Sequence, residues 1–174
     1  MEIELEFDRH RRHTAWIRDT IHRYGWAIQA VLAEPDTGEP DHAYTIGLTA
    51  LHHPELLIAG LHPHDAAALL NLLATRIRAG DPPPAGTTLD DLAPPNRHHL
   101  LALDPAASDE LLLHANATYQ HPDGPPVAAL QIIWSDPAGT LPWETGCTGD
   151  AAHQPLAGPP PDPDHHTPGD RPHP

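Results

Sequence analysis

Apolar positions recur at helical spacing in two long segments of the chain. The first predicts a helix over roughly residues 14–24, because its apolar side chains share one face, Thr14 is able to cap the N-terminus and Gly25 suits the left-handed residue that ends a helix. The second lies within residues 62–81, where apolar positions repeat every three or four residues and Gly80 closes the segment. These segments supply two helices of the predicted domain.

Four other segments have the patterns of β-strands. Residues 26–33 follow the period of two that is typical of a strand. Two Pro, one Gly and four acidic residues make a turn of residues 34–41, so the apolar run at 43–48 is expected to return as an antiparallel neighbour. Residues 56–61 are short and apolar enough for a central strand, and the continuous apolar run at 127–134 predicts a further buried strand.

The chain between the second helix and the last strand is less regular. Residues 82–99 are predicted to be mostly loop, with a short edge strand near 87–89, and a strand is expected over 99–103. Asp104 followed by Pro opens a third helix, which the turn residues at 120–126 end.

The order of these elements predicts one α+β domain over residues 14–158. Early strands follow one another through short turns, which favours a mostly antiparallel sheet covered by about three helices. Residues 1–13 are interpreted as a charged N-terminal leader, frayed at its start. Seven of the sixteen residues in 159–174 are Pro, interspersed with Asp and His, and this segment is predicted to be a disordered tail.

The charge of the chain narrows the classes of partner. The formal net charge is −15 and all nine basic residues are Arg, so a polyanion meets an unfavourable field and a nucleic-acid partner is not expected. No segment approaches the roughly 20 apolar residues of a membrane span, and the acidic start lacks a secretory signal. Because Cys147 is alone, no intrachain disulfide forms, and we expect a soluble, cytoplasmic protein.

The sixteen His and twenty-three Pro residues have a simple interpretation. Without any Lys and with abundant Ala and Arg, this composition is typical of a GC-rich genome, and we favour that explanation over a metal store. A minor alternative is a zinc-type site in which His62 and His64 combine with His52 or His53, although the spacing matches no standard zinc pattern.

Several sequence blocks, taken in order, resemble one family. HRYGWAIQAV, AYTIGL, HPELLIAGL, LLNLL, ALQIIWSD, LPWE and QPL are similar to an uncharacterised, mainly bacterial family, the domain of unknown function 4262, over roughly residues 14–158. The resemblance implies a fold and a set of positions, but no reaction. Ser135 departs from the family's Trp-Pro-Asp motif, which is expected to loosen the turn after the last strand. The matching positions are Gly25, Trp26, Tyr44, Thr45, Gly47, Leu48, His53, Pro54, Glu55, Leu56, Gln131, Trp134, Asp136, Gly139, Pro142, Trp143 and Gln154.

Candidate ligand-binding residues occur first around the strand at 43–48. Tyr44 lies on this strand beside Gly47, where the missing side chain admits either a ligand or a packed neighbour, and we favour packing. His53 and Glu55 flank a Pro that fixes the backbone, so they form either a general base with its carboxylate or an ion pair at a loop rim.

A second set of candidates surrounds the last strand. Gln131 is a polar side chain inside an apolar run, and a buried amide without partners costs about 1–3 kcal/mol, so it must bond either to a loop such as Pro-Trp-Glu or to a ligand. Trp134, Asp136, Trp143 and Glu144 follow, and two indoles with two carboxylates predict an aromatic, acidic pocket for a cationic or hydrogen-bond-donating molecule. The competing interpretation is a Trp-capped core.

These residues lead to a hypothesis about function. We expect an accessory protein that binds a small molecule or a partner polypeptide, with both sets of candidates brought together by the sheet. The alternative is a small hydrolytic or metal-assisted enzyme that uses His53 with Glu55, or the group of His52, His62 and His64. The sequence names neither a cofactor nor an oligomeric state.

Overall fold

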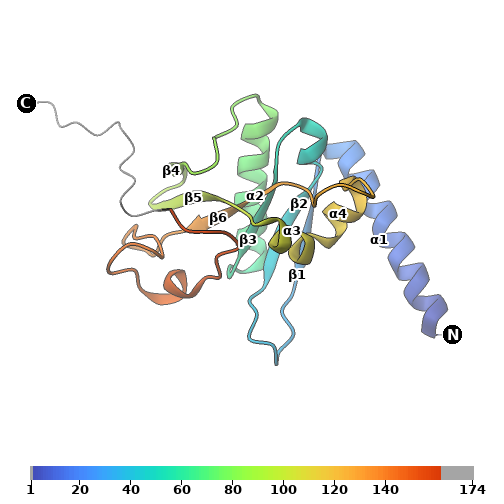
Figure 1. Cartoon of the computed structure of the whole chain (residues 1–174), viewed down its shortest axis with the longest axis horizontal. Helices are drawn as coiled ribbons and strands as arrows, with labels where there is room; N and C mark the ends of the chain where they lie inside the picture. The colour runs from blue at the N-terminus through green and yellow to red at the C-terminus, as the bar shows by residue number, and fades with distance from the viewer. Residues whose placement is uncertain (1, 162–174) are drawn as a thin grey trace, which may run out of the picture.

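The fold is a six-stranded sheet with helices on both faces, in a computed structural model that describes residues 2–161 (Figure 1). The sheet order is β1-β2-β3-β6-β5-β4. Only β3 and β6 pair in parallel, and every other neighbouring pair is antiparallel. The strands are β1 (Ala27–Val31), β2 (His42–Ile46), β3 (Glu55–Ala59), β4 (Thr88–Ala93), β5 (Asn96–Ala102) and β6 (Ala129–Trp134). The prediction of an α+β domain with a mostly antiparallel sheet is confirmed.

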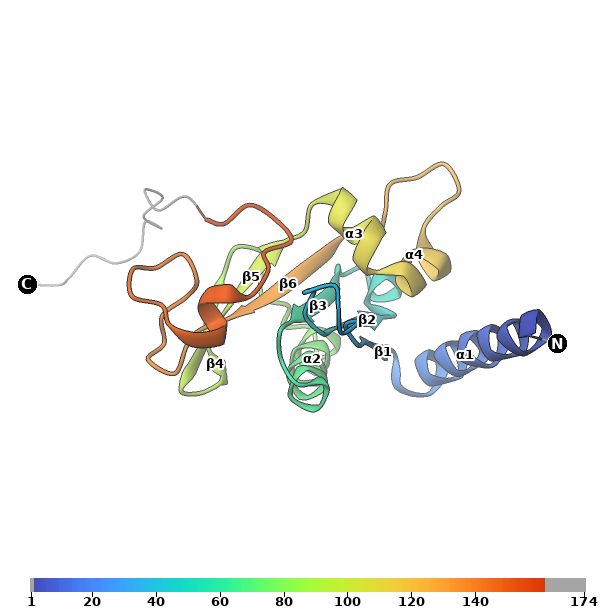
Figure 2. The ribbon, with the colours of Figure 1, turned by 90° about the horizontal axis from the view of Figure 1, so that it is seen from below.

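The helices are distributed over the two faces of the sheet. Helix α2 covers one face and α3 and α4 cover the other, so that the sheet lies between them in Figure 2. The helices are α1 (Glu2–Tyr24), α2 (Pro63–Arg78), α3 (Pro105–Leu111) and α4 (Leu113–Tyr119), with short 3-10 helices η1 (Leu48–Leu51) and η2 (Gly149–His153).

The alternation of side chains along the central strands produces two cores. On the α2 face, Leu56 and Ile58 of β3 pack with Leu70 of α2, and none of the three is exposed to solvent. On the opposite face, Leu57 packs in a cluster with Leu112, next to α4. Burial of each such side chain stabilises the fold by about 1.5–3 kcal/mol relative to leaving it exposed. Because β3 and β6 are covered on both faces, their sequences are apolar throughout, as in the predicted buried strands.

Helix α1 is longer than the sequence pattern predicted. The predicted start at Thr14 is wrong, because the helix begins at Glu2 and the Thr14 hydroxyl donates to the His10 carbonyl inside it. The charged residues of the leader are compatible with a helix, since Arg11 and Arg12 pair with Asp8 one turn away. The first half of α1 projects from the body of the molecule (Figures 1 and 2).

The region between α2 and β6 also differs from the prediction. Instead of mostly loop, residues 88–102 form the β4–β5 hairpin, which turns at Pro94 and Pro95 and contains a register shift between Leu89 and Ala93. The predicted third helix is divided into α3 and α4 at Leu112, whose ψ of 47° interrupts the helical backbone. The predicted disorder of the tail concerns mainly residues 162–174, which lie outside the described residues.

Candidate functional site

Glu55 is a buried carboxylate whose oxygens are occupied by protein donors. It stands at the start of β3, has no exposed surface and faces the beginning of η1. Its Oε1 accepts the N–H groups of Gly47 and Thr49, each at 3.0 Å. Hydroxyls of Thr45 and Thr49 donate at 2.7 and 2.8 Å, and the Leu48 N–H approaches Oε2 at 3.3 Å. A carboxylate at the positive end of a helical turn, with five donors, organises the chain around it.

The neighbouring candidates at this corner also contact protein groups. His53 does not pair with Glu55, because its Nδ1 lies 2.7 Å from the Pro54 carbonyl oxygen. At Gly47, whose φ is 137°, a Cβ would come within 2.6 Å of the Gly25 carbonyl oxygen, so the absent side chain serves packing. Tyr44 is buried on β2, and its hydroxyl accepts the His114 N–H at 3.2 Å. Burial raises the pKa of Tyr44, so its phenol stays protonated at neutral pH.

Asp136 organises the loop after β6. Its Oδ1 accepts the N–H groups of Ala138 and Thr140 at 3.0 and 2.8 Å, and Oδ2 accepts both the N–H and the hydroxyl of Thr148 at 3.1 Å. These bonds, above all the one from Thr140, lower the pKa of Asp136. Cys147 lies in the same loop, where burial raises the pKa of its thiol, so the cysteine is a poor nucleophile.

The other candidates near β6 have structural partners as well. Glu144 accepts from Arg97 Nη1 at 2.9 Å and from the Leu141 N–H at 2.8 Å. The Trp134 indole N–H donates to the Ala59 carbonyl at 3.0 Å, which ties β6 to the end of β3. Trp143 packs edge-on against a histidine ring of β5, at a centroid distance of 5.0 Å. Trp134 and Trp143 therefore anchor the fold.

Ser135 does not loosen the turn, in contrast to the prediction. Its N–H donates to the Arg97 carbonyl at 2.9 Å, and its hydroxyl accepts the Arg97 N–H at 2.9 Å. A proline here would lack the N–H group and the hydroxyl that make these two bonds. Ser135 thus extends the pairing of β6 with β5 by one residue.

The two sets of predicted residues do not share one location. Glu55 is paired with Ala129 in the parallel β3–β6 register, and Trp134 lies five residues further along β6. At about 3.3 Å per residue, the corner at Glu55 and the loop after Trp134 are separated by the length of the central strands. Asp136, Trp143 and Glu144 follow β6 at one end of the sheet, and Tyr44, His53 and Glu55 lie towards the other. The predicted pocket between two indoles is absent, because Trp134 packs with the core on the α2 face whereas Trp143 packs with Leu101 and Ile133 on the opposite face.

Gln131 lies between these regions and holds a segment that crosses β6. Its Nε2 donates to the Pro155 carbonyl and its Oε1 accepts the Ala157 N–H, both at 2.7 Å. Gln154 does the same for Trp134, accepting its N–H at 3.1 Å and donating to its carbonyl. The predicted bond of Gln131 to a loop is therefore present, although the loop is residues 154–157, here called the strap, rather than Pro-Trp-Glu.

A cleft of about 260 Å³ lies beside the strap, on the face of the sheet opposite α2. Its lining comes from β2, β3 and β6, from α3, from the strap and from the β1–β2 loop. Gln131 is the one predicted ligand-binding residue that lines it. The lining residues are Glu39, Pro40, His42, Leu57, Ala59, Ala107, Glu110, Leu111, Gln131, Pro155, Leu156 and Ala157. We call this the strap cleft.

Three side chains give the strap cleft hydrogen-bond acceptors, namely His42, Glu39 and Glu110. His42 is partly buried, and burial lowers its pKa, so the imidazole is neutral at pH 7. The His42 Nε2 lies 3.3 Å from the Leu111 carbonyl oxygen. In the tautomer that carries its proton on Nε2, this nitrogen donates to Leu111 and Nδ1 is an acceptor. Glu39 and Glu110 add exposed carboxylates at the rim, whereas both ends of the Gln131 amide are already bonded.

Sequence reasoning missed His42, Glu39 and Glu110. A sequence signal for His42 existed, because alternation along β2 places it on the same face as the candidate Tyr44. In the structure the two rings stack with their centroids 6.2 Å apart. No sequence signal connected Glu110 to this site, because only the packing of α3 against the sheet brings it there.

The geometry does not support a metal-assisted reaction at the predicted histidines. His52 precedes β3, whereas His62 and His64 follow it, so the group is divided between the two ends of a strand. His62 Nδ1 accepts the His64 N–H at 3.2 Å and caps α2. Over residues 2–161, no group of three or more His, Cys, Asp or Glu side chains is arranged to hold a metal ion.

Among the helices of residues 2–161, none is long and apolar enough to span a membrane.

Comparison with known proteins identifies the family. A family model described as "Domain of unknown function (DUF4262)" matches residues 20–148, which is well over half of the chain, so the chain belongs to this family. No curated protein and no solved structure matches the chain. The family carries no stated activity, and the geometry of the site is the basis for a functional proposal.

Proposed function

We propose that this member of the DUF4262 family is a binding protein for a small molecule that joins a compact apolar part to a cationic or hydrogen-bond-donating group, and that the strap cleft is its site. The observation that carries the proposal is the combination of apolar lining residues with the acceptor groups of three side chains. Leu57 and Ala59 present hydrocarbon, and His42, Glu39 and Glu110 present hydrogen-bond acceptors. Concave, mostly apolar sites with a few convergent polar groups are typical of ligand binding.

The size and charge of the cleft limit the ligand. At about 260 Å³ the cleft suits a fragment-sized molecule rather than a dinucleotide. Because Glu39 and Glu110 stand at the rim of a chain with net charge −15, a carboxylate or phosphate is disfavoured and an amine is attracted.

Calorimetric titration with benzylamine, benzyl alcohol and benzoate tests this chemistry directly. We expect saturable binding of benzylamine, weaker binding of the alcohol and none of benzoate. Glu110→Gln should weaken benzylamine by about two- to fivefold, the range for a solvent-exposed ion pair, and leave the alcohol unchanged. Equal binding of benzoate and benzylamine would refute the proposed polarity.

A matched pair of variants tests the location. Ala107 lines the cleft, while its neighbour Ala106 on α3 is exposed and does not. Ala107→Trp should abolish benzylamine binding and Ala106→Trp should preserve it, with melting temperatures recorded for both. Retention of binding by a folded Ala107→Trp variant would place the ligand elsewhere. Native mass spectrometry of untagged protein would then show whether any retained metabolite is lost in the same variant.

A further inference from the structure

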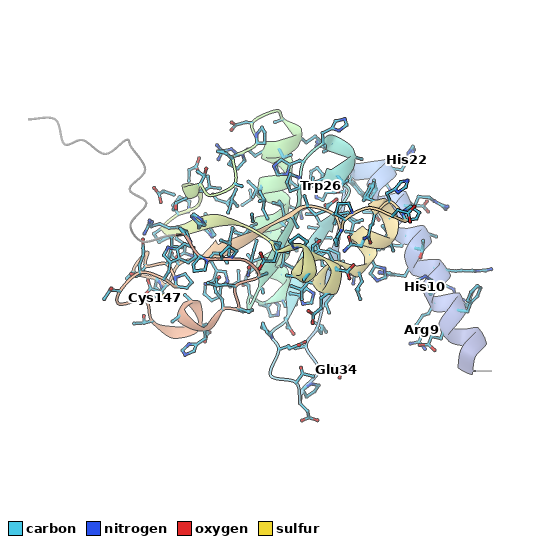
Figure 3. All side chains as sticks on the ribbon, in the orientation of Figure 1. Arg9, His10, His22, Trp26, Glu34 and Cys147 are labelled. Atoms are coloured by element: carbon cyan, nitrogen blue, oxygen red, sulfur yellow. The ribbon has the colours of Figure 1, made fainter. Side chains whose placement is uncertain are left out.

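A second hollow lies on the other side of the molecule, where β1 runs between α1 and α2. It has a volume of about 500 Å³, and the residues that line it come from all three elements. We call it the helix groove. Its lining comprises Trp16, Thr20, Tyr24, Trp26, Ile28, Ala30, Pro63, Ala67, Asn71, Thr75 and Arg78. In Figure 3, Trp26 lies in the body of the molecule, whereas Arg9 and His10 lie on the projecting part of α1.

The floor of the helix groove is an open sheet edge. β1 is the first strand of the sheet, and within residues 2–161 it pairs only with β2. In an antiparallel pair, every second residue directs its peptide groups away from the partner strand. The Gln29 side chain donates to the Ala30 carbonyl, which identifies Ala30, and by alternation Ile28, as the residues that face outward. The N–H groups of Ile28 and Ala30 and the Ile28 carbonyl therefore remain for an added strand.

The side chains of the groove suit an apolar peptide. Trp16 and Tyr24 of α1 are 46% and 55% exposed, so aromatic surface is available above the strand. Trp26 is fixed beneath them, because its indole N–H donates to Asn71 Oδ1 at 3.0 Å. Such rigid aromatic groups gain binding energy at a small cost in conformational entropy.

The charge of the groove is opposite to that of the chain. The net charge is −15, yet the lining contains no Asp or Glu and one Arg. The Arg78 guanidinium lies 5.1 Å from the centroid of the Trp26 ring and donates to the Tyr24 carbonyl at 2.9 Å. Within the described part of the chain no carboxylate forms a salt bridge with Arg78, whereas Arg76 of the same helix pairs with Asp81 and Asp91.

We propose that the helix groove binds an extended peptide segment of a partner protein, which adds to β1 as a further strand, sets apolar side chains against Trp16 and Ile28, and places a carboxylate on Arg78. Backbone hydrogen bonds to a sheet edge give such complexes affinity, and side-chain pockets give them specificity. A peptide strand added to β1 would lie beside the residues of α1 and α2 that line the groove. For a second copy of this chain to bind here, its β1 would have to come within about 4.8 Å of this β1. Helices α1 and α2 flank β1 in both copies.

Selection of random octapeptides displayed with a free C-terminus, followed by fluorescence polarisation of the enriched peptides, tests this proposal on the full chain. Ala30→Pro removes an outward N–H at an exposed edge position where proline is tolerated. Loss of a backbone hydrogen bond and of strand addition should weaken binding about tenfold or more, while the matched Ala30→Ser variant should bind within about twofold of the wild type. Circular dichroism should show the same melting behaviour for both variants.

Two experiments test whether the peptide carboxylate that binds Arg78 is the C-terminus or an internal Asp side chain. Arg78→Gln should weaken the enriched peptides about tenfold, as expected for a lost charge-assisted hydrogen bond. Amidation of the C-terminus, or replacement of an internal Asp by Asn, should reproduce that loss, and the arm that does so identifies the carboxylate. If neither arm changes the affinity, the assignment to Arg78 is wrong.

Other outcomes would overturn the proposal as a whole. Absence of any enriched peptide, or equal binding to a folded Ala30→Pro variant, excludes strand addition at β1. A concentration-dependent dimer in sedimentation that disappears in Ala30→Pro would make a second copy the occupant. Ala107→Trp, which fills the strap cleft, should leave peptide binding intact, so failure of one proposal is distinguishable from failure of the other.

Discussion

Replacement of Glu55 by Gln is expected to destabilise the protein strongly while changing only one atom of the side chain. The carboxylate accepts from three backbone N–H groups and two hydroxyls. An amide retains one acceptor oxygen and turns the other into a donor. Whichever oxygen is replaced, the new NH₂ faces at least one backbone N–H that has no freedom to turn away.

The least costly orientation follows from the distances. If the NH₂ takes the place of Oε2, it faces the Leu48 N–H, already the longest contact at 3.3 Å, and the Thr45 hydroxyl. That hydroxyl oxygen also accepts the Leu56 N–H at 2.9 Å. One buried N–H then loses its partner, at about 1–3 kcal/mol, and the remaining bonds lose the charge that strengthens them. We expect a loss of about 2–4 kcal/mol from a typical total of 5–15 kcal/mol.

Urea unfolding followed by circular dichroism measures this loss. Glu34→Gln is the matched control, because Glu34 is exposed in the loop after β1 and should change the stability by less than about 0.5 kcal/mol. If Glu55→Gln unfolds within about 0.5 kcal/mol of the wild type, the carboxylate does not hold η1 and the beginning of β3 together. Glu55 would then again be available as a ligand-binding or catalytic group.

Three further perturbations follow from the structure. Gly47→Ala should lower the free energy of unfolding in urea by about 2–4 kcal/mol, because a Cβ at this position would lie 2.6 Å from a backbone oxygen. In the control Gly38→Ala, the residue also has a positive φ but its Cβ would meet open space, so the loss should be only about 1–2 kcal/mol. Equal losses in the two variants would contradict the steric argument. Burial lowers the pKa of His98, which is 1% exposed, so the unfolded chain binds the proton first as the pH falls below about 6.5 and stability declines there. His98→Leu should therefore lose less stability between about pH 7.5 and pH 5.5 than the wild type, and an unchanged pH dependence would exclude His98 as a cause. Gln131→Leu should accelerate hydrogen exchange of the Ala157 amide, which donates to Gln131, and unaltered exchange would show that the strap is held by other contacts.

The local pattern of the chain determined most of the secondary structure. The period of two at 26–33 and the apolar runs at 56–61 and 127–134 predicted β1, β3 and β6, because alternation and burial are properties of neighbouring residues. The predictions failed where local signals were ambiguous, as at α1 and at the β4–β5 hairpin. The charged leader lacks an apolar face yet continues α1, and the polar, Pro-rich segment before β5 conceals a hairpin that pairing with β6 stabilises.

Tertiary structure alone decided the roles of the candidate residues. A sequence shows that Glu55 and Gln131 are polar among apolar neighbours and so require partners, but it does not name those partners. The fold gives Glu55 the amides of η1 and gives Gln131 the strap, across sequence separations that no periodicity spans. The strap cleft likewise arises because α3, the strap and the β1–β2 loop converge on one face of the sheet. The local sequence therefore determined which buried polar side chains need hydrogen-bond partners, and long-range packing determined which groups are those partners.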